Sequence, residues 1–554
     1  MTAKYEWWQK TVVYQIYPRS FKDSTGNGIG DLRGVIEKLD YLEKLGIETI
    51  WFSPFYPSPQ QDHGYDITNF VDVDPEYGTL ADFDELLKKA HERRLKIVLD
   101  MILNHTSDKH PWFLQSRSSR DDPKRDWYIW RDGRGKKGKK PPNNWKAMTG
   151  GCPWIFDKKT SQWYFYHFLP FQPDLNMRNP EVKKAMFDAC RFWLDRGVDG
   201  FRLDIFHATF VDAQFQDNPR VWTILPGETH NKSLFQDHIY DLHQPENYEF
   251  AIELRKLIDS YSTPRFLVGE VFGTKEQIRN YCGPNNNGLN MVFFFKFSGI
   301  RMNPKGIYSI ITENDTLFPF PYTPTYVYSN HDRIRMISRF SDDPTKAKLM
   351  ATLQLTLRGV PFMYNGEEIG MPQESFSLRK SQDPVAHKWW WMPITQSKRL
   401  GFSFSRDGCR TPLQWSAAPN AGFSSNESAT PWLKISKTYT KINVEAQEAD
   451  PNSLLNFYRR LLKIRRSNIA LQEGELQLLS PTKKSLIYYR IHSTQKLAIL
   501  LNFTKKNISL SISSLLSNPT LIFSTYLKST TLDQYSTTQT ITLQPFEGLI
   551  LRTN

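Results

Sequence analysis

The chain has 554 residues, more than one ordinary hydrophobic core accommodates, so two or three domains are expected. Its 39% hydrophobic and 14% aromatic content is typical of a soluble globular protein, and the lack of an apolar run of roughly 18 residues argues against a membrane span. The formal charge of +13 comes from basic residues spread along the chain, apart from one run at 131–140. That run has no interleaved aromatics and no helical period, so it predicts a solvated loop with no nucleic-acid partner.

The four cysteines, Cys152, Cys190, Cys282 and Cys409, are widely spaced and form no CxxC or Cys/His metal pattern. We therefore expect free thiols in a reducing compartment. The first ten residues contain no apolar core of the kind that a signal peptide carries. These features together predict a cytoplasmic protein that does not bind a membrane.

Buried strands alternate with amphipathic helices along most of the chain, which predicts a parallel sheet with helices outside it. The apolar period predicts helices over 31–45, 79–94, 180–196, 245–261 and 454–465, with Thr79 capping the second and Gly46 ending the first. The expected strands are 12–17, 47–53, 96–103, 200–205, 266–271, 290–297, 326–329 and 361–364. Eight such repeats close into a (β/α)8 TIM barrel, so the expected fold class is α/β.

Two regions depart from this alternation. Residues 104–176 are rich in Trp, Pro, Lys and Gly and predict a lobe inserted after strand 3. The catalytic barrel would then comprise residues 1–103 and 177–472, with an irregular excursion at 372–450 after strand 8. Residues 473–554 contain short strand-like runs separated by turns, which predict a C-terminal all-β domain of the β-sandwich kind.

The strand at 200–205 carries a carboxylate at its C-terminal end, where the chemistry of such a barrel lies. Arg202 precedes Asp204 by two residues and so shares its face of the strand. A neighbouring Arg is expected to keep this carboxylate ionised and oriented, which suits a nucleophile, and the alternative is a structural Arg–Asp pair.

Other strands end in polar side chains as well, namely Asp100, Asn104, His105, Glu270, His331, Asp332 and Glu368. Carboxylates that converge on one mouth repel one another and raise some of their pKa values. Two carboxylates of different basicity are what glycoside hydrolysis requires, because one must be ionised and the other protonated.

The strand-end segments occur in a recognisable order, namely 100–105 (DMILNH), 200–204 (GFRLD), 269–271 (GEV) and 329–332 (SNHD). With them the chain resembles the α-amylase superfamily, glycoside hydrolase family 13, and in particular its oligo-1,6-glucosidase and α-glucosidase branch. Two further segments resemble motifs of that branch, 172–176 (QPDLN) and 406–415 (RDGCRTPLQW).

The resemblance implies a role for each matching residue. Asp204 would be the nucleophile of a retaining reaction, Glu270 the acid and then the base, and Asp332 a stabiliser of the transition state. Retention implies that the carboxyl groups of Asp204 and Glu270 lie roughly 5–5.5 Å apart. Without the motifs, His105 and His331 would be read as satisfied core histidines. The expected substrate-binding residues are Asp66, His105, Arg202, His331 and Arg410.

The segment 23–31 resembles a calcium loop, with oxygen ligands at alternate positions and glycines for the sharp turn. Its candidate ligands are Asp23, Thr25, Asn27, Ile29 and Asp31. Only two of these are carboxylates, so a hydrogen-bonded turn without metal is the alternative. Catalysis itself is expected to need no cofactor, and Ca²⁺ would be a structural ion.

The function that these features favour is an exo-acting α-glucosidase that removes glucose from short oligosaccharides. Three alternatives remain open: a transglycosylating or isomerising enzyme on sucrose or trehalose, a trehalose-6-phosphate hydrolase, and a non-enzymatic scaffold similar to transporter-associated heavy chains. Ile205, which follows the nucleophile, leaves the choice between α-1,4 and α-1,6 linkages open. A monomer or a weak homo-oligomer is expected.

Overall fold

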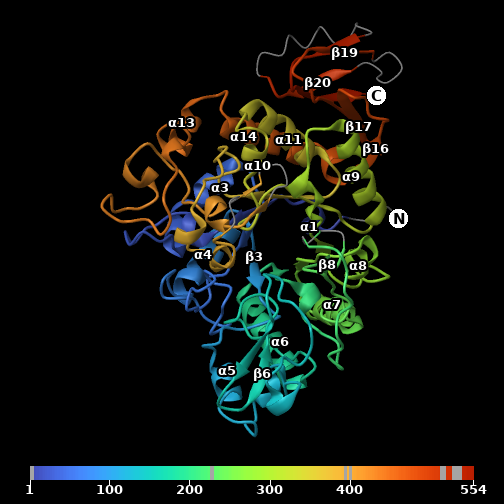
Figure 1. Cartoon of the computed structure of the whole chain (residues 1–554). Coiled ribbons are helices and arrows are strands. Elements are labelled where there is room, and N and C mark those ends of the chain that lie inside the picture. The colour runs from blue at the N-terminus through green and yellow to red at the C-terminus, as the bar shows by residue number, and fades with distance from the viewer. Residues whose placement is uncertain are drawn as a thin grey trace.

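A computed structural model describes residues 5–224, 227, 230–391, 396–397, 402–511, 519–526 and 540–553. A barrel occupies the centre of the molecule (Figure 1). A lobe that carries α5 and β6 projects from one end, and the C-terminal sheets lie at the opposite end (Figure 1).

Eight parallel strands form the barrel sheet, in the hydrogen-bonded order β11-β10-β7-β3-β2-β1-β13-β12. Their bounds are β1 Val13–Ile16, β2 Thr49–Phe52, β3 Lys96–Met101, β7 Gly200–Leu203, β10 Phe266–Gly269, β11 Met291–Val292, β12 Thr325–Val327 and β13 Val360–Tyr364. The strands at the two ends of this order, β11 and β12, are linked through a side chain. Thr325 Oγ1 donates to the Val292 carbonyl (2.9 Å) and accepts from the Phe294 amide (3.1 Å). The predicted (β/α)8 barrel is therefore confirmed.

The helices around the barrel follow the predicted pattern. Thr79 caps α4 through a capping box with Asp82, and Gly46 ends α3 in the left-handed conformation at φ 95°. The helix predicted over 31–45 is two helices, separated at Lys38. The helices are α1 Trp7–Lys10, α2 Leu32–Glu37, α3 Leu39–Leu45, α4 Leu80–Glu92, α6 Pro180–Arg196, α7 Pro245–Asp259, α8 Lys275–Asn280, α9 Pro304–Leu317, α10 Met336–Arg339, α11 Pro344–Thr356 and α14 Leu454–Ser467. Two 3-10 helices, η1 Pro18–Ser20 and η5 Phe295–Gly299, lie between them.

Side chains inside the barrel form an apolar layer, which includes Val13, Trp51, Val98, Val268 and Phe362. Because side chains alternate along a strand, the inward-facing positions two residues further on form the next layer. That next layer is polar, and it contains Gln15, Ser53, Asp100 and Glu270. The polar layer therefore lies at the C-terminal ends of the strands, on top of the apolar layer, and we call it the polar floor.

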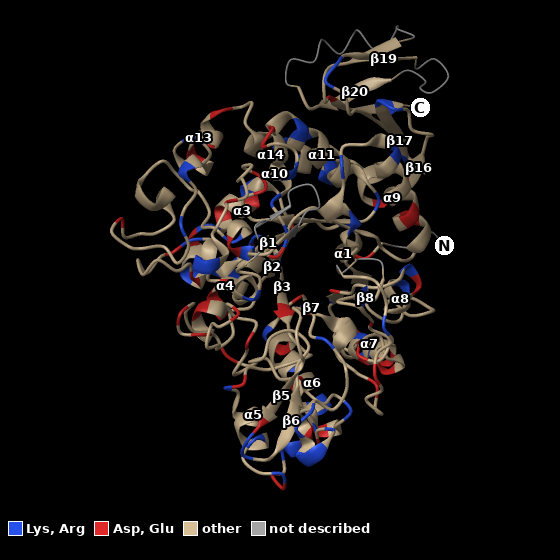
Figure 2. Ribbon diagram, in the orientation of Figure 1, with Lys and Arg blue, Asp and Glu red and all other residues tan. Residues whose placement is uncertain are grey.

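The inserted lobe contains a three-stranded antiparallel sheet in the order β4-β6-β5. Its elements are α5 Pro111–Ser116, η2 Arg125–Trp127, β4 Trp130–Arg131, η3 Lys136–Gly138, β5 Trp154–Asp157 and β6 Gln162–Phe165. The basic run at 131–140 is largely exposed, as predicted, and basic residues gather at the tip of the lobe (Figure 2).

Two long segments after barrel strands complete the mouth of the barrel. After β7 come η4 Phe206–Ala208, β8 Lys232–Ser233 and β9 Gln236–Asp237. After β13 come η6 Leu378–Lys380, α12 Pro384–Lys388, β14 Gln396–Ser397, β15 Phe402–Ser403, η7 Arg406–Cys409, η8 Pro419–Gly422, η9 Lys437–Thr440 and α13 Val444–Ala449. We call this second segment, 372–450, the excursion.

The C-terminal domain has two antiparallel sheets, β16-β17-β18-β22-β20 and β19-β21, with an apolar cluster between them. Its elements are α15 Ile469–Glu473, β16 Glu475–Leu478, β17 Ser485–His492, β18 Gln495–Asn502, β19 Ile508–Ser511, β20 Thr520–Ser524, β21 Thr540–Leu543 and β22 Gly548–Thr553. The predicted C-terminal all-β domain is confirmed.

Among the described residues, no helix combines the length and the apolar character needed to cross a bilayer. All four cysteines are free thiols, and of these only Cys152 is exposed.

A buried arginine, Arg490, joins the C-terminal domain to the barrel, and a second, Arg465 of the barrel helix α14, binds carbonyls at the same end of α11. Arg490 on β17 donates to the carbonyls of Thr356 (2.7 Å) and Gly474 (2.9 Å), and Arg465 donates to those of Leu355 (2.8 Å) and Gly359 (2.9 Å). Burial, together with the nearby charge of Arg465, lowers the pKa of Arg490 to about 9. These contacts satisfy backbone carbonyls at the ends of α11 that would otherwise be buried without donors.

We expect Arg490→Met to destabilise the contact between the two domains by about 2–4 kcal/mol, because it leaves buried carbonyls without donors. Differential scanning calorimetry should show a lower Tm. Arg552→Met, which removes an exposed arginine of β22, is the matched control and should leave the Tm within about 1 °C. Equal Tm values for the two variants would contradict this account of the interface.

Candidate active site

The guanidinium of Arg202 is the centre of the polar floor. Its Nη1 donates to Asp100 Oδ1 (2.8 Å) and Asp204 Oδ1 (2.6 Å), and its Nη2 donates to Glu270 Oε2 (2.6 Å). Arg202 is fully buried, and its guanidinium carbon lies 5.4 Å from the ring centre of Trp51 in the apolar layer. Three strands, β3, β7 and β10, thus bring their terminal carboxylates to one cation.

One cation cannot neutralise three buried carboxylates. Burial raises the pKa of Asp204 to about 7, opposed by Arg202 and assisted by the charges of Asp100 and Asp332. Burial likewise raises the pKa of Glu270 to about 7 and that of Asp100 to about 6. We expected Arg202 to keep the Asp204 carboxylate ionised. Its effect on the pKa of Asp204 is smaller than that of burial, because Arg202 is shared with Asp100 and Glu270. Near neutral pH the cluster holds at least one proton, as acid–base chemistry between two carboxyl groups requires.

The backbone is strained next to Asp204. Ile205 has φ 30° and ψ 45°, in the left-handed region that β-branched residues avoid. In this conformation its amide donates to Glu270 Oε2 (3.2 Å). A strained residue of this kind costs about 1–3 kcal/mol, and here it fixes the second carboxylate relative to the first.

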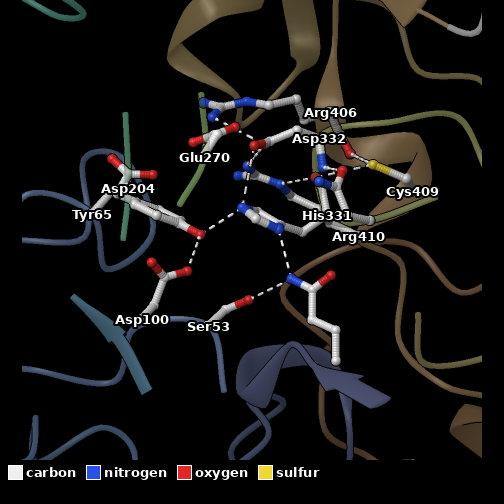
Figure 3. A network of polar contacts seen from close by, with 12 residues as sticks. Ser53, Tyr65, Asp100, Asp204, Glu270, His331, Asp332, Arg406, Cys409 and Arg410 are labelled. Atoms are coloured by element: carbon white, nitrogen blue, oxygen red, sulfur yellow. Dashed lines mark hydrogen bonds and ion pairs between the residues drawn. The ribbon is translucent and has the colours of Figure 1, made fainter. Parts of the chain in front are cut away.

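A line of hydrogen bonds crosses the floor from β1 to the loop after β12 (Figure 3). Burial lowers the pKa of His331 far below its usual range, so the ring is neutral. Gln15 Nε2 donates to His331 Nδ1 (2.6 Å), which leaves the ring proton on Nε2. That Nε2 lies 2.5 Å from Tyr65 Oη and 3.2 Å from Asp332 Oδ2. Tyr65 Oη in turn donates to Asp100 Oδ2 (3.0 Å).

Asp332 has partners quite different from those of Asp204. Arg410 Nη2 lies 2.7 Å and Arg406 Nη1 3.5 Å from Asp332 Oδ1. Burial raises the pKa of Asp332, but His331, Arg406, Arg410 and Arg202 together lower it below its usual range. Its side chain is 30% exposed, against 10% for Asp204. Asp332 is thus an ionised group on the open side of the site.

Asp66, a predicted substrate-binding residue, does not reach this site. Its carboxylate accepts from Ser58 Oγ (3.0 Å) and from the amides of Gln61 (3.0 Å) and Asp62 (2.9 Å), so it holds the loop after β2 together. Asp62 is the acidic residue of this loop that reaches the site, where its Oδ1 accepts from Arg406 Nη2 (2.6 Å). Asp66 thus supports the loop, and Asp62 contacts the site.

His105 lies where the lobe meets the barrel. Its Nδ1 is 2.9 Å from Asn104 Oδ1, and its backbone pairs with that of Asp174, within the 172–176 motif. Burial lowers the pKa of His105 to about 4, so it is a neutral ring at the site. Of the remaining predicted site residues, Arg202 contacts Asp204. His331 and Arg410 lie beside Asp332 (Figure 3).

The candidate calcium loop is a closely hydrogen-bonded turn. Asp23 accepts from the amides of Gly26 (2.7 Å) and Gly28 (2.8 Å) and from Ser424 Oγ (2.6 Å). Asp31 accepts from Ser24 Oγ (2.7 Å) and caps α2 through the Gly34 amide (2.6 Å). Thr25 and Asn27 are exposed and Ile29 is half-buried. In the part of the chain that the structure describes, no three His, Cys, Asp or Glu side chains gather as a metal site.

Several residues of the site were not predicted to act there: Asp62, Tyr65 and Arg406, with Asp100 as a third carboxylate. Asp62 and Tyr65 belong to the same short loop as Asp66, and Arg406 opens the 406–415 motif. The sequence offered one indication of their role, namely that Asp62, Tyr65 and Arg406 lie beside or within the segments that carry Asp66 and the 406–415 motif. Which member of each segment faces the site depends on the folded loop.

A (β/α)8 barrel with three buried carboxyl groups of raised pKa and a fourth, ionised carboxylate at the strand ends defines the class of acid–base glycosidases. The family description "Alpha amylase, catalytic domain" matches residues 15–474, so the chain belongs to that family and is an enzyme of the glycoside hydrolase type. This confirms the resemblance that the strand-end motifs carry.

Individual relatives agree with this assignment. A probable alpha-glucosidase of Rhizobium meliloti is 41% identical over 515 residues, 90% of each chain. An oligo-1,6-glucosidase of Heyndrickxia coagulans is 37% identical over 533 residues, 91% of this chain and 93% of its own. Among solved structures, the alpha-glucosyl transfer enzyme XgtA superposes with a TM-score of 0.88 at 35% identity, over 100% of both chains.

The shared guanidinium makes stability depend on pH. The pKa values of Asp204 and Glu270 rise from 3.8 and 4.5 when unfolded to about 7 when folded. Folding therefore favours the protonated forms, and this contribution is complete at low pH and lost as the pH rises through the folded pKa. Asp204→Asn and Glu270→Gln should raise the Tm by about 2–4 °C at about pH 8, and by much less at about pH 5. Thermal melts in both buffers test this, and a Tm gain that is equal at the two pH values would contradict it.

Proposed function

We propose that the protein is a retaining, exo-acting α-glucosidase that releases single glucose units from short α-linked oligosaccharides. The observation that carries the proposal is that Asp204 and Glu270 are held on the two amino nitrogens of one buried guanidinium. That arrangement supports the short carboxyl separation, roughly 5–5.5 Å, that a covalent glycosyl intermediate requires. The names of the two relatives at 41% and 37% identity support the α-glucoside as substrate.

The first step uses the two carboxyl groups in opposite protonation states. Asp204, ionised, attacks the anomeric carbon, and Glu270 gives its proton to the glycosidic oxygen as the bond to the leaving sugar breaks. The product is a glucosyl ester of Asp204 and a free alcohol. Asp332, held ionised by Arg406 and Arg410, stabilises the positive charge that develops on the sugar ring.

The second step reverses the proton transfer. Glu270, now ionised, takes a proton from a water molecule, whose oxygen attacks the anomeric carbon and releases Asp204. The two inversions give net retention of configuration. The Ile205 amide, 3.2 Å from Glu270 Oε2, favours the ionised form of Glu270 at this stage, because a hydrogen bond to a charged carboxylate stabilises it.

A closed end beside Asp332 supports exo action. Arg406 joins Asp62, on the loop after β2, to Asp383 of the excursion (2.6 and 2.7 Å). Arg410 lies on the same wall, where it donates to the His331 carbonyl (2.9 Å). In this proposal the wall of ion pairs closes one end of the site, so that a terminal glucose ring binds against it and a longer chain cannot pass through.

Transfer to an alcohol other than water is the second candidate outcome. The solved structure of XgtA is described as that of an alpha-glucosyl transfer enzyme, and it covers the full chain. The first step is common to both outcomes, so the balance between them is set by what occupies the acceptor side.

The proposal is tested by product analysis with maltose, isomaltose, sucrose, trehalose and trehalose 6-phosphate. We expect glucose as the product from maltose or isomaltose, with the α-anomer appearing first in an NMR time course. Asp204→Asn should lower kcat by at least about 10⁴-fold, because the nucleophile is lost, and leave the circular dichroism spectrum intact. Initial release of the β-anomer, or an active Asp204→Asn protein, would contradict the mechanism.

The exchange of roles between Asp62 and Asp66 gives a separate prediction. Asp62→Asn removes one of the two buried carboxylates that hold Arg406 beside Asp332, and kcat/KM should fall by about 100-fold or more. Asp66→Asn keeps an acceptor for the loop amides, so we expect a lower Tm but a loss in kcat/KM of less than about tenfold. A larger catalytic loss in Asp66→Asn than in Asp62→Asn would reverse the assignment.

We further propose that the chemistry requires no cofactor, because two carboxyl groups supply the acid, the base and the nucleophile. If the 23–31 loop binds Ca²⁺, its ligands would be Asp23, Thr25, Asn27, Ile29 and Asp31, and the ion would act on stability. Treatment with EDTA should leave kcat unchanged within about twofold. A higher Tm with added Ca²⁺ than without it would show that the loop binds the ion. Loss of kcat that Ca²⁺ restores would show that the ion is needed for turnover.

The proposed location is the cytoplasm, supported by four cysteines that are all free, one of them exposed. The proposed partner is the oligosaccharide alone, and the protein is proposed to act as a monomer or a weak homo-oligomer.

A further inference from the structure

A short segment of the excursion, residues 383–391, crosses from the wall of the site to the inserted lobe; we call it the strap. At its first end, the Asp383 carboxylate accepts from Arg406 Nη2 (2.7 Å) and from the Arg406 amide (2.7 Å), and it caps α12 through the Val385 amide (3.0 Å). Because Arg406 also contacts Asp332, the strap begins one residue away from the catalytic floor.

The second end of the strap is tied to the lobe. Lys388 Nζ donates to Thr149 Oγ1 (2.5 Å) and to the Gly150 carbonyl (3.3 Å). Thr149 Oγ1 donates in turn to the Phe168 carbonyl (2.6 Å), and the Phe168 ring lies 5.6 Å from the guanidinium of Arg406. The strap therefore closes a ring of contacts that begins and ends at Arg406.

Three consecutive tryptophans follow directly after this tie. The Trp389 ring is half-buried, 5.4 Å from the ring of Phe404. Trp390 and Trp391 are 51% and 60% exposed, and the guanidinium of Arg379 lies 4.7 Å from the Trp390 ring. Two neighbouring exposed indoles cost solvation free energy unless a ligand covers them, so such a patch marks a binding surface.

We propose that Trp390 and Trp391 form a platform for the sugar ring that leaves with the glycosidic oxygen, or that enters as the acceptor. This inference rests on the proposed function and adds a determinant of substrate choice to it. A pyranose ring presents a face of C–H groups, which packs on the flat, electron-rich face of an indole. Lys388, which is tied to the lobe, lies two residues before Trp390, so this tie limits how far the two rings can move from the lobe and lowers the entropic cost of binding a sugar.

The platform distinguishes leaving groups by whether they contain a ring. α-Glucosyl fluoride carries a single atom as its leaving group and gains nothing from the platform, whereas maltose carries a full ring. The measurement is the ratio of kcat/KM for maltose to kcat/KM for α-glucosyl fluoride, because this ratio cancels any general damage to the catalytic floor.

In the double variant Trp390→Ala/Trp391→Ala this ratio should fall about four- to 100-fold, at about two- to tenfold per ring. Trp390→Phe/Trp391→Phe keeps two flat faces and should retain most of the ratio. Trp222→Ala, which removes a tryptophan that is 98% exposed on the segment after β7, is the matched control and should leave the ratio at its wild-type value. An unchanged ratio in the alanine double variant, or an equal loss in the phenylalanine variant, would overturn the proposal.

Calorimetric binding of maltose to the Asp204→Asn protein gives a reading that is independent of turnover. Adding Trp390→Ala/Trp391→Ala to that protein should weaken the Kd for maltose by about the same factor, and unchanged affinity would overturn the platform. If the wild-type protein hydrolyses neither α-glucosyl fluoride nor maltose, the proposed function fails. If it hydrolyses both and the ratio is insensitive to the strap, only the platform fails.

Discussion

One buried guanidinium sets the chemistry of this site. Arg202 is surrounded by Asp100, Asp204 and Glu270, so a single positive charge faces three largely buried carboxyl groups. Full ionisation would leave a net charge of about −2 in a medium of low dielectric constant, which is too costly to persist at neutral pH. The cluster must therefore retain a proton, and this proton is what general acid catalysis uses.

The contrast with Asp332 follows from the same reasoning. Asp332 lies beside two arginines that come from the excursion, and it is the more exposed carboxylate. Its pKa is lowered while that of Glu270 is raised. Groups of one chemical type thus acquire opposite protonation states from the number of cations around each, which is the separation that acid–base chemistry by carboxyl groups depends on.

Sequence reasoning reached the barrel and the catalytic carboxylates because both depend on local patterns. Side chains two positions apart on a strand face the same side. The inward faces that begin at Val98, Gly200 and Val268 therefore continue at Asp100, Arg202 and Glu270. Closure of the barrel then brings those ends together, whatever the loops do. The first predicted helix, 31–45, was wrong as one continuous helix for the complementary reason, because the break at Lys38 is not marked by any Pro or Gly at that position.

What the sequence could not decide is how each loop uses its own polar groups. Asp62 and Asp66 stand four residues apart in one loop, and either could face a sugar. The Asp66 carboxylate accepts hydrogen bonds from the loop amides at 61 and 62, whereas the Asp62 carboxylate binds Arg406. The direction of the pKa shift at Asp204 was likewise out of reach, because it depends on how many carboxylates share Arg202.

The excursion helps to position the polar floor, because its residues bind the loop after β12, which carries His331 and Asp332. Arg410 Nε and Cys409 Sγ both donate to the His331 carbonyl (2.9 and 3.1 Å), and Arg406 and Arg410 bind the carboxylate of the next residue. The Asp332 carboxylate is thus oriented by contacts from the 3-10 helix η7 and the residue after it, more than 70 positions further along the chain. Since η7 also carries the arginine that binds Asp62 and Asp383, a shift of the excursion would alter the ionised carboxylate and the closed wall together. In the proposed mechanism the barrel floor supplies the proton and the nucleophile, and the excursion forms the wall of ion pairs beside them.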